Sequence, residues 1–409
     1  MKIKKMLLSV LVIILIFGGA LSVNTLAVTD YEYIYLSQDY MVTEDGWRVS
    51  MDAFYKGDIV GYEGELESVT IPTEINGEPV GDIFIINNTK LKEVIVPDYF
   101  SNKRIVFHGS KALTSVKLPS NKGFIEKYAF FACVNLIRVE MPNDLKFIGS
   151  FAFAGCKNLK EIGLPDSIET LGSFAFQACS SLENITIPKN CKKIGNSIFE
   201  ECTNLKVISI LSETITAVYE NPSEIIEGIE ESKTETENAL PEKFAYGCTS
   251  LKSINLPEST KFIGESAFQN SGLTSITIPK NVKTIYKNAF KGCENLTSVK
   301  FAGAVNNIGK SAFSKCVNLK TVNFTKGYLK KVYDYAFYKC EKLEKITISN
   351  TKNVPTIAKS AFNKAKSGIK FYVKNNTVAK KLKAKLQKTN IKKAKIYRSA
   401  PILIYKNVG

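Results

Sequence analysis

Cysteines recur at a nearly constant interval along this chain, and that interval restricts the fold more than any other feature. Around them runs the unit A-F-x-x-C-x-x-L-x-x-[IV]-x-[IL]-P, followed by Ile-Gly shortly before the next Ala-Phe. Self-similarity at this period predicts a solenoid, in which each coil contacts only its neighbours. Eight of the nine cysteines follow intervals of 23, 23, 23, 46, 45, 23 and 24 residues: Cys133, Cys156, Cys179, Cys202, Cys248, Cys293, Cys316 and Cys340.

Each position of the unit has a structural role. In "LKEIGLP" the alternation predicts a short strand whose Leu159, Ile162 and Leu164 point inward. Pro165 cannot donate a backbone hydrogen bond, so it ends the strand. The glycine of Ile-Gly gives the chain room to bend. We expect the phenylalanine of Ala-Phe to stack from coil to coil as an interior spine, because one coil alone cannot bury it.

Twelve strand modules predict the fold class, a leucine-rich-repeat solenoid with a parallel β-sheet on one face. It would have about 12 repeats of 23 residues and a cap at each end. At about 4.8 Å per strand, the sheet would be roughly 55–60 Å long. The modules begin at Leu66, Leu91, Leu113, Leu136, Leu159, Leu182, Leu205, Leu251, Leu273, Leu296, Leu319 and Leu343.

The N-terminus has the pattern of an export signal. The basic "MKIKK" precedes an apolar run from Met6 to Ala20, and small residues favour cleavage after Ala27. An uncleaved signal anchor is the alternative. We therefore predict a signal peptide over 1–27, an N-terminal cap over 28–61, the solenoid over 62–369, and a basic C-terminal cap and tail over 370–409. No membrane span is expected after signal removal.

Two segments depart from the repeat. An insertion at about 212–242 carries nine Glu and one Lys, which predicts a solvated loop and a candidate contact site. The alternative is an insertion that the fold tolerates and that is not a contact site. In the tail, Asn376 or Thr377 is the expected cap of a helix with Val378, Leu382 and Leu386 on one face. A final strand near "KAKIY" would close the end of the sheet.

The repeat cysteines suit buried, reduced thiols better than disulfides. Their side chains would point in parallel into the core, and Asn88 and Ser110 fill the same slot in earlier coils. C-x-x-C spacing is missing from the sequence, which disfavours zinc. Cys191, in the "PKNCKKIG" turn, is the one thiol expected near solvent.

The sequence predicts no enzyme and no cofactor. The chain has a single histidine, His108, and a Ser-His-Asp or Cys-His arrangement would have to use it. We expect it instead at the surface or edge of a degenerate coil. Neither H-E-x-x-H nor a phosphate loop occurs in the sequence.

Binding has two candidate locations. On the sheet face, Ser, Thr and Asn dominate the outward columns and aromatic residues are missing, which also suits an ordinary exposed strand. The candidate protein-binding residues there are Lys117, Arg138, Glu140, Glu161, Thr186, Asn255, Lys300 and Asn323.

The second location is the basic end. The net charge is +16, and residues 370–409 hold twelve Lys or Arg and no acidic residue. Such a segment favours polyanions near a surface over nucleic acid, although a soluble cap also explains it. The candidate polyanion-binding residues are Lys380, Lys381, Lys383, Lys385, Lys388, Lys392, Lys393 and Lys395.

The repeat resembles the BspA-type leucine-rich repeat family of secreted and surface proteins, over about Tyr62 to Lys395. The resemblance implies adhesion or recognition at a cell surface, with a protein ligand on a host or bacterial surface. Periodicity alone implies only a solenoid. The alternative function is a wall-associated structural protein that binds an anionic cell-wall polymer or glycan. Both place the protein outside the cell, secreted or surface-associated.

Overall fold

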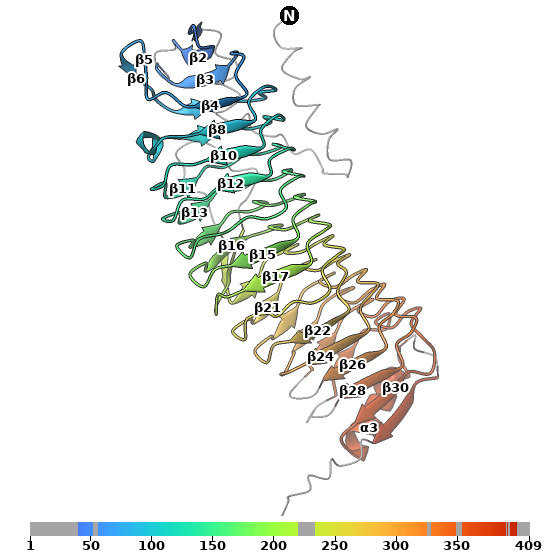
Figure 1. Ribbon diagram of the computed structural model, residues 1–409. Helices are drawn as coiled ribbons and strands as arrows, with labels where there is room; N and C mark the ends of the chain where they lie inside the picture. The colour runs from blue at the N-terminus through green and yellow to red at the C-terminus, as the bar shows by residue number, and fades with distance from the viewer. Residues whose placement is uncertain are drawn as a thin grey trace, which may run out of the picture.

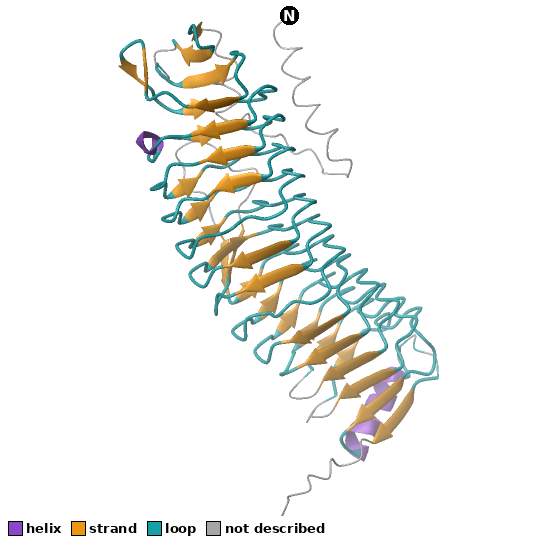
Figure 2. Cartoon of the chain, viewed as in Figure 1, coloured by secondary structure: helices purple, strands orange, loops and turns teal. Residues whose placement is uncertain are grey.

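The computed structural model describes residues 40–51, 56–219, 234–324, 329–348, 354–389, 391 and 393–398. They form one elongated stack in which each coil lies on the coil before it (Figure 1). Strands and turns make up nearly all of it, and the one α-helix of the described part, α3 (Asn376–Leu386), lies at the C-terminal end (Figure 2). The predicted signal peptide, 1–27, lies outside the described residues.

The first strand row takes one strand from most coils and corresponds to the predicted sheet face (Figure 1). Its strands pair in parallel, in sheets of four, two and six strands rather than one unbroken ladder. At one break, Gly163 stands where other coils place an outward side chain, and an interior glycine weakens a strand. The row comprises β4 (Ser68–Thr70), β8 (Glu93–Ile95), β10 (Ser115–Lys117), β12 (Arg138–Glu140), β15 (Asn184–Ile187), β17 (Val207–Ile210), β22 (Ser275–Ile278), β24 (Ser298–Phe301), β26 (Thr321–Phe324), β28 (Lys345–Ile348), β30 (Lys370–Val373) and β31 (Lys395–Arg398).

A second strand row forms where the sequence predicts only a bend. The Ile-Gly segments of successive coils lie side by side and pair as short parallel strands. Glycine is required by close approach of the preceding coil: a Cβ on Gly149 would lie 2.4 Å from the backbone N of Lys127. The row comprises β11 (Phe124–Ile125), β13 (Phe147–Ile148), β14 (Thr170–Leu171), β16 (Lys193–Gly195), β18 (Thr216–Tyr219), β19 (Thr234–Glu237), β20 (Ala239–Leu240), β21 (Phe262–Ile263), β23 (Thr284–Ile285), β25 (Asn307–Ile308), β27 (Lys331–Val332) and β29 (Thr356–Ile357).

The N-terminal end is a sheet ordered β1-β2-β3-β7-β9. Trp47 is buried there, with its ring 4.7 Å from the ring of Tyr62. Leu66, counted as the first inward leucine, is instead 65% exposed. Tyr62 is buried, and its hydroxyl accepts a hydrogen bond from the Leu66 N–H at 3.2 Å. The elements are β1 (Tyr40–Val42), β2 (Trp47–Ser50), β3 (Ile59–Tyr62), β7 (Ile83–Phe84) and β9 (Ile105–Val106), with the hairpin β5 (Glu74–Ile75) and β6 (Glu78–Pro79) and the 3₁₀ turn η1 (Asp98–Phe100).

The predicted phenylalanine spine is confirmed. From Phe107 to Phe362 every member is buried, and neighbouring ring centres lie 5.1–6.2 Å apart. Most pairs are stacked, but Phe244 meets both neighbours edge-on, at the coil that follows the insertion. The spine therefore carries the stack through the insertion without a gap.

All nine cysteines are free and buried, as predicted for eight of them. Each repeat cysteine donates its S–H to the carbonyl of a spine phenylalanine in the preceding coil, as Cys133 does to Phe107 at 3.0 Å. The Ser110 hydroxyl makes the corresponding bond to Ile85 at 2.8 Å. The slot therefore requires a small donor.

The prediction for Cys191 is wrong. Its thiol is fully buried, because Cys191 takes the inward position that leads into the second strand row, the position held by Leu145 and Ile168 in earlier coils. Burial raises the pKa of this thiol to about 12.

These thiols should not react while the protein is folded. A thiol reagent in native buffer should titrate none of the nine cysteines, and it should titrate all nine in denaturant, because only exposed thiolates attack. A single fast-reacting thiol, identified as Cys191 by mass spectrometry, would show that Cys191 lies near solvent, as the sequence predicts.

The insertion is more ordered than the predicted solvated loop. Thr216–Tyr219 forms β18, which pairs in parallel with β16 and so supplies the second-row strand of its coil. β19 then returns antiparallel to β18 as a hairpin. The prediction missed this strand because "ITAVY" lacks the Ile-Gly pair by which the segment is recognised elsewhere. Residues 220–233 lie outside the described residues.

The C-terminal end follows the predicted order of helix and strand. Helix α3 buries Val378, Leu382 and Leu386 as expected. Its cap is Asn375 rather than Asn376 or Thr377, since the Asn375 side chain accepts from the Val378 N–H at 2.9 Å. β31 forms at "KIYR" and is the last strand in the order of its sheet. β30 and β31 extend the first row beyond the twelve counted modules.

Candidate functional site

The predicted face residues lie on outward positions of the first strand row, but spread along its length. Lys117 stands opposite Glu140 on the paired strands β10 and β12, and Lys300 stands opposite Asn323 on β24 and β26. Glu161 and Asn255 are exposed in the two coils that lack a first-row strand, and Thr186 is exposed on β15. The eight residues therefore form no single cluster.

The N-terminal part of this face carries positive and negative side chains that pair with one another. Arg138 and Glu140, which lie on the same side of β12, form an ion pair at 3.0 Å. At the other edge of the same four-stranded sheet, Ser68 on β4 donates to Glu93 on β8 at 3.4 Å. The predicted anchor Arg138 thus already has a partner within the protein.

The C-terminal part of the face differs in charge and in aromatic content. The six first-row strands β22, β24, β26, β28, β30 and β31 contain five basic residues and no Asp or Glu. The sequence predicts no aromatic residue in the outward columns of the twelve counted modules, but Tyr372 and Tyr397, on the two strands beyond them, continue the outward column of Lys300 and Asn323. The alternation Lys-x-Tyr in "KFYV" and "KIYR" is the signal that could have revealed them.

The predicted polyanion-binding lysines divide into two groups on α3 and beyond it. Lys380, Lys381, Lys383 and Lys388 are exposed on or just after the helix, and Lys393 and Lys395 are exposed after it. Lys392 lies outside the described residues. Lys385 is a correction: its Nζ donates to the carbonyls of Val354 and Pro355 at 3.0 and 3.1 Å, so it anchors the helix to the preceding coil.

A strip of half-buried aromatic rings, not predicted from the sequence, lies along the turns before the spine. Tyr128, Phe151 and Phe174 stack at 5.1 and 4.5 Å. Each has a positive φ, between 58° and 59°, where bulky residues are rare. Other coils place Ser197 and Asn288 at this position. The recurring "SFAF" in the sequence is the signal for the strip.

His108 extends this aromatic strip and takes part in no catalytic arrangement that the structure describes. Its ring lies 5.0 Å from that of Phe131 and 6.3 Å from that of Tyr128. Burial lowers the pKa of His108 to about 4. It is half-buried rather than a surface residue.

The pKa of His108 can be measured without assignment, because it is the only histidine. An NMR titration of its ring protons should give about 4 instead of 6.5. A depressed pKa means that the contribution of His108 to stability is present above 6.5 and lost as pH falls through 4. A midpoint near 6.5 would show that the ring is solvated.

Clefts open on the surface of the described residues, and two of them are lined by charged side chains. One, of about 310 Å³, lies between the hairpin residue Thr236 and second-row residues including Phe262 and Tyr286. Two carboxylates line it, those of Glu242 and Glu265. Lys287 pairs with Glu265 at 2.8 Å. Burial and the neighbouring Glu265 raise the pKa of Glu242.

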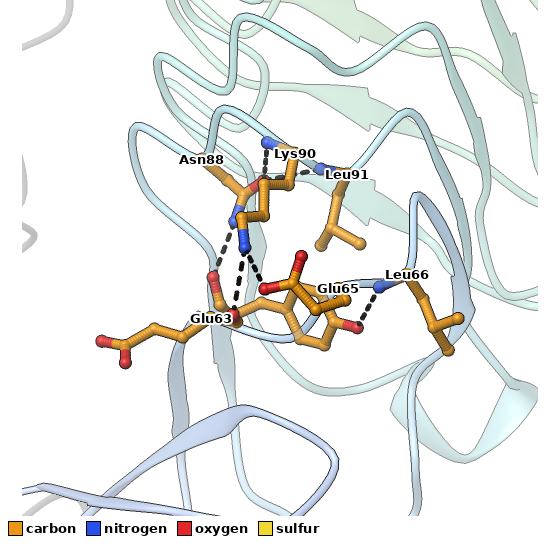
Figure 3. Close-up of polar contacts among 7 residues, drawn as sticks. Glu63, Glu65, Leu66, Asn88, Lys90 and Leu91 are labelled. Atoms are coloured by element: carbon orange, nitrogen blue, oxygen red, sulfur yellow. Dashed lines mark hydrogen bonds and ion pairs between the residues drawn. The ribbon is translucent and has the colours of Figure 1, made fainter.

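The other cleft, of about 300 Å³, lies beside the N-terminal sheet. A network of polar contacts there includes the lining residues Glu63, Asn88 and Lys90 (Figure 3). Asn88, in the cysteine slot, donates to the Tyr62 carbonyl at 2.9 Å and accepts from the N–H groups of Lys90 and Leu91. The Lys90 ammonium pairs with Glu65 at 2.8 Å. This network holds the first coils together.

Within the described ranges, no three His, Cys, Asp or Glu side chains form a group able to hold a metal ion. In the same ranges, no helix is long and apolar enough to cross a bilayer.

Comparison with known proteins places the chain in a family. The model of the BspA type leucine rich repeat region matches in six copies, over residues 100–222, 235–330 and 283–403. No curated protein matches.

Solved structures give weaker, fold-level similarity. A leucine-rich repeat protein from Bacteroides ovatus is 20% identical, covering 88% of this chain and 98% of its own, with a TM-score of 0.40. A leucine rich cell surface protein from Faecalibacterium prausnitzii is 21% identical, covering 81% and 94%, with a TM-score of 0.41. The pneumococcal vaccine antigen PcpA is 16% identical, covering 88% and 99%, with a TM-score of 0.46. The family model spans more than half of the sequence. The chain therefore belongs to the BspA-type leucine-rich repeat family.

Proposed function

We propose that this protein is exported and acts, without catalysis, as a recognition protein at a cell surface. Its ligand is a protein on a host or bacterial surface, bound by the outward face of the first strand row. The observation that carries the proposal is the run of outward Ser, Thr, Asn and Lys side chains, exposed or half-buried, that is held in register from β22 to β28. Leucine-rich repeat proteins of this type are typically non-enzymatic surface proteins, which supports the same role.

A second candidate function is retention on an anionic wall polymer or glycan through the basic C-terminal end. The observation that favours it is the exposed lysine set on and after α3. Such attachment weakens steeply with salt because it depends on counterion release.

Binding to immobilised surface proteins tests the first function. The intact protein should bind one of them saturably at both 50 and 200 mM salt. Thr277→Arg combined with Lys300→Glu, both in the outward column of the first row, should weaken binding at least about tenfold. Lys261→Glu with Lys283→Glu, exposed beside the second row, is the control: it makes a larger change in charge away from the face and should have little effect. Equal loss in both double variants would argue against the first-row face.

A further inference from the structure

Three lysines stand in a line at the C-terminal end of the first strand row. Lys345 is directly opposite Lys370, and Lys370 is directly opposite Lys395. Neighbouring strands lie about 4.8 Å apart, and like charges directly opposite one another destabilise a sheet. All three side chains are exposed. The arrangement is therefore unfavourable in the free protein.

The carboxylate beside this line, that of Glu344, is held mainly by another lysine: Lys366 is the first cause that lowers its pKa, and Lys370 of the line contributes less. Glu344 precedes Lys345, but its carboxylate pairs with Lys366 at 2.7 Å. Across the described residues, none of the three lysines forms an ion pair. The N-terminal strands of the same row behave differently, because there the charges alternate in sign and pair internally.

Two tyrosines flank the line in the adjacent outward column. The rings of Tyr372 and Tyr397 stack at 5.3 Å, and the Lys345 ammonium lies 4.8 Å from the centre of the Tyr372 ring. Tyr397, on the last strand of the sheet, is 39% exposed. Within the described part of the chain, neither tyrosine hydroxyl has a hydrogen-bond partner. The patch thus combines three ammonium groups with two aromatic rings and two free hydroxyls.

We propose that this Lys-Tyr patch, defined as Lys345, Lys370, Lys395, Tyr372 and Tyr397, binds a linear polysaccharide that carries an acidic group on each sugar. The ammonium groups would pair with successive acidic groups along the chain, while the tyrosines contact sugar rings and hydroxyls. This inference rests on the second candidate function and locates it on the sheet rather than on helix α3.

The geometry favours a glycan over other polyanions. A single-stranded nucleic acid needs ring faces on which its bases can stack, but here the two rings cover one face of each other. An acidic peptide would satisfy the lysines, yet it would leave the tyrosine hydroxyls with fewer polar partners than a sugar provides.

The test uses the intact protein and defined polymers. Polygalacturonate is the acidic glycan probe, dextran the neutral glycan, polyglutamate the acidic peptide and oligo-dT the nucleic acid. Three variants are compared: Lys345→Gln/Lys370→Gln/Lys395→Gln, Tyr372→Ser/Tyr397→Ser, and the helix control Lys380→Gln/Lys381→Gln/Lys383→Gln. All substituted residues are partly or fully exposed, and thermal melts confirm folding.

We expect polygalacturonate to bind and dextran not to bind. The lysine variant should weaken binding roughly 10- to 100-fold at 50 mM salt and reduce the slope of log K against log salt by about 2. The tyrosine variant should weaken binding by about tenfold, whereas the helix control should change it less than about threefold. The lysine variant should also melt at a higher temperature at low salt, since it removes repulsion.

Four results would overturn the inference. If the helix control loses binding and the lysine variant keeps it, a polymer binds at α3 and only the second candidate function survives. If no variant affects binding, or no acidic polymer binds, the second function fails as well. Equal binding of polyglutamate or oligo-dT with the same dependence on the tyrosines would reject the glycan as ligand.

Discussion

Phe176→Ala should cost about 3–5 kcal/mol of unfolding free energy, among the largest effects of any single substitution in this protein. Phe176 is fully buried in the spine, stacked on Phe153 at 5.5 Å and on Phe199 at 6.0 Å. Truncation leaves a cavity between coils, and a solenoid coil has only its two neighbours to close it. Urea unfolding followed by circular dichroism measures the loss.

Phe174→Asn is the matched control in the same coil. Phe174 is half-buried in the left-handed region of backbone space, with φ 59°, and Asn288 holds the same position elsewhere. Asparagine tolerates this conformation better than phenylalanine does, so the lost stacking on Phe151 is partly offset and the net cost should be about 1 kcal/mol or less. Equal effects of the two substitutions would mean that the spine does not hold the coils together.

Lys122→Met should destabilise the protein by a similar amount, about 3–5 kcal/mol at pH 7, because it leaves a buried carboxylate without its counter-charge. Lys122 is 0% exposed. Its Nζ lies 2.9 Å from Glu126 Oε1 and donates to the Lys103 carbonyl at 2.7 Å. Glu126 Oε2 is buried and has no hydrogen-bond partner.

The penalty should depend on pH with a defined sign. Burial raises the pKa of Glu126 above 4.5, and Lys122 opposes the rise. A group with a raised folded pKa stabilises most below its unfolded pKa and loses that contribution as pH rises. The Lys122→Met penalty should therefore shrink between pH 7 and pH 4.5, and the double variant Lys122→Met/Glu126→Leu should recover most of the stability. A penalty independent of pH, with no recovery in the double variant, would show that packing rather than charge is lost.

Much of the fold follows from the sequence because the repeat is strict. Stacking requires each coil to bury the same positions, so Phe153, Cys156 and Leu159 could be placed in the core from their spacing alone. The second strand row was not predictable by the same reasoning. Its strands are mostly two residues long, and pairing between coils, not a local apolar alternation, defines them.

Departures from the repeat were predicted less well. The turn sequence around Cys191 predicts an exposed thiol. Cys191 nevertheless points inward, because it aligns with the buried Leu145 of an earlier coil. The hairpin in the insertion forms because β16 offers a free strand edge to Thr216–Tyr219, which is a tertiary effect.

For the candidate site, the sequence predicted the outward columns but not their grouping. Charge and spacing could not show that Arg138 pairs with Glu140 or that Lys385 anchors α3. The Lys-Tyr patch depends on the alignment of β28, β30 and β31 across loops of different length, and only the register brings Lys345 level with Lys395.

Chemical footprinting of lysines tests most directly the claim that the first strand row is the binding surface. The intact protein is acetylated with and without its bound ligand, and each lysine is quantified by mass spectrometry. With a protein ligand Lys300 should be protected, and with polygalacturonate Lys345, Lys370 and Lys395 should be protected, while Lys261 and Lys283 beside the second row react as before. Protection confined to Lys261 and Lys283 would contradict the account.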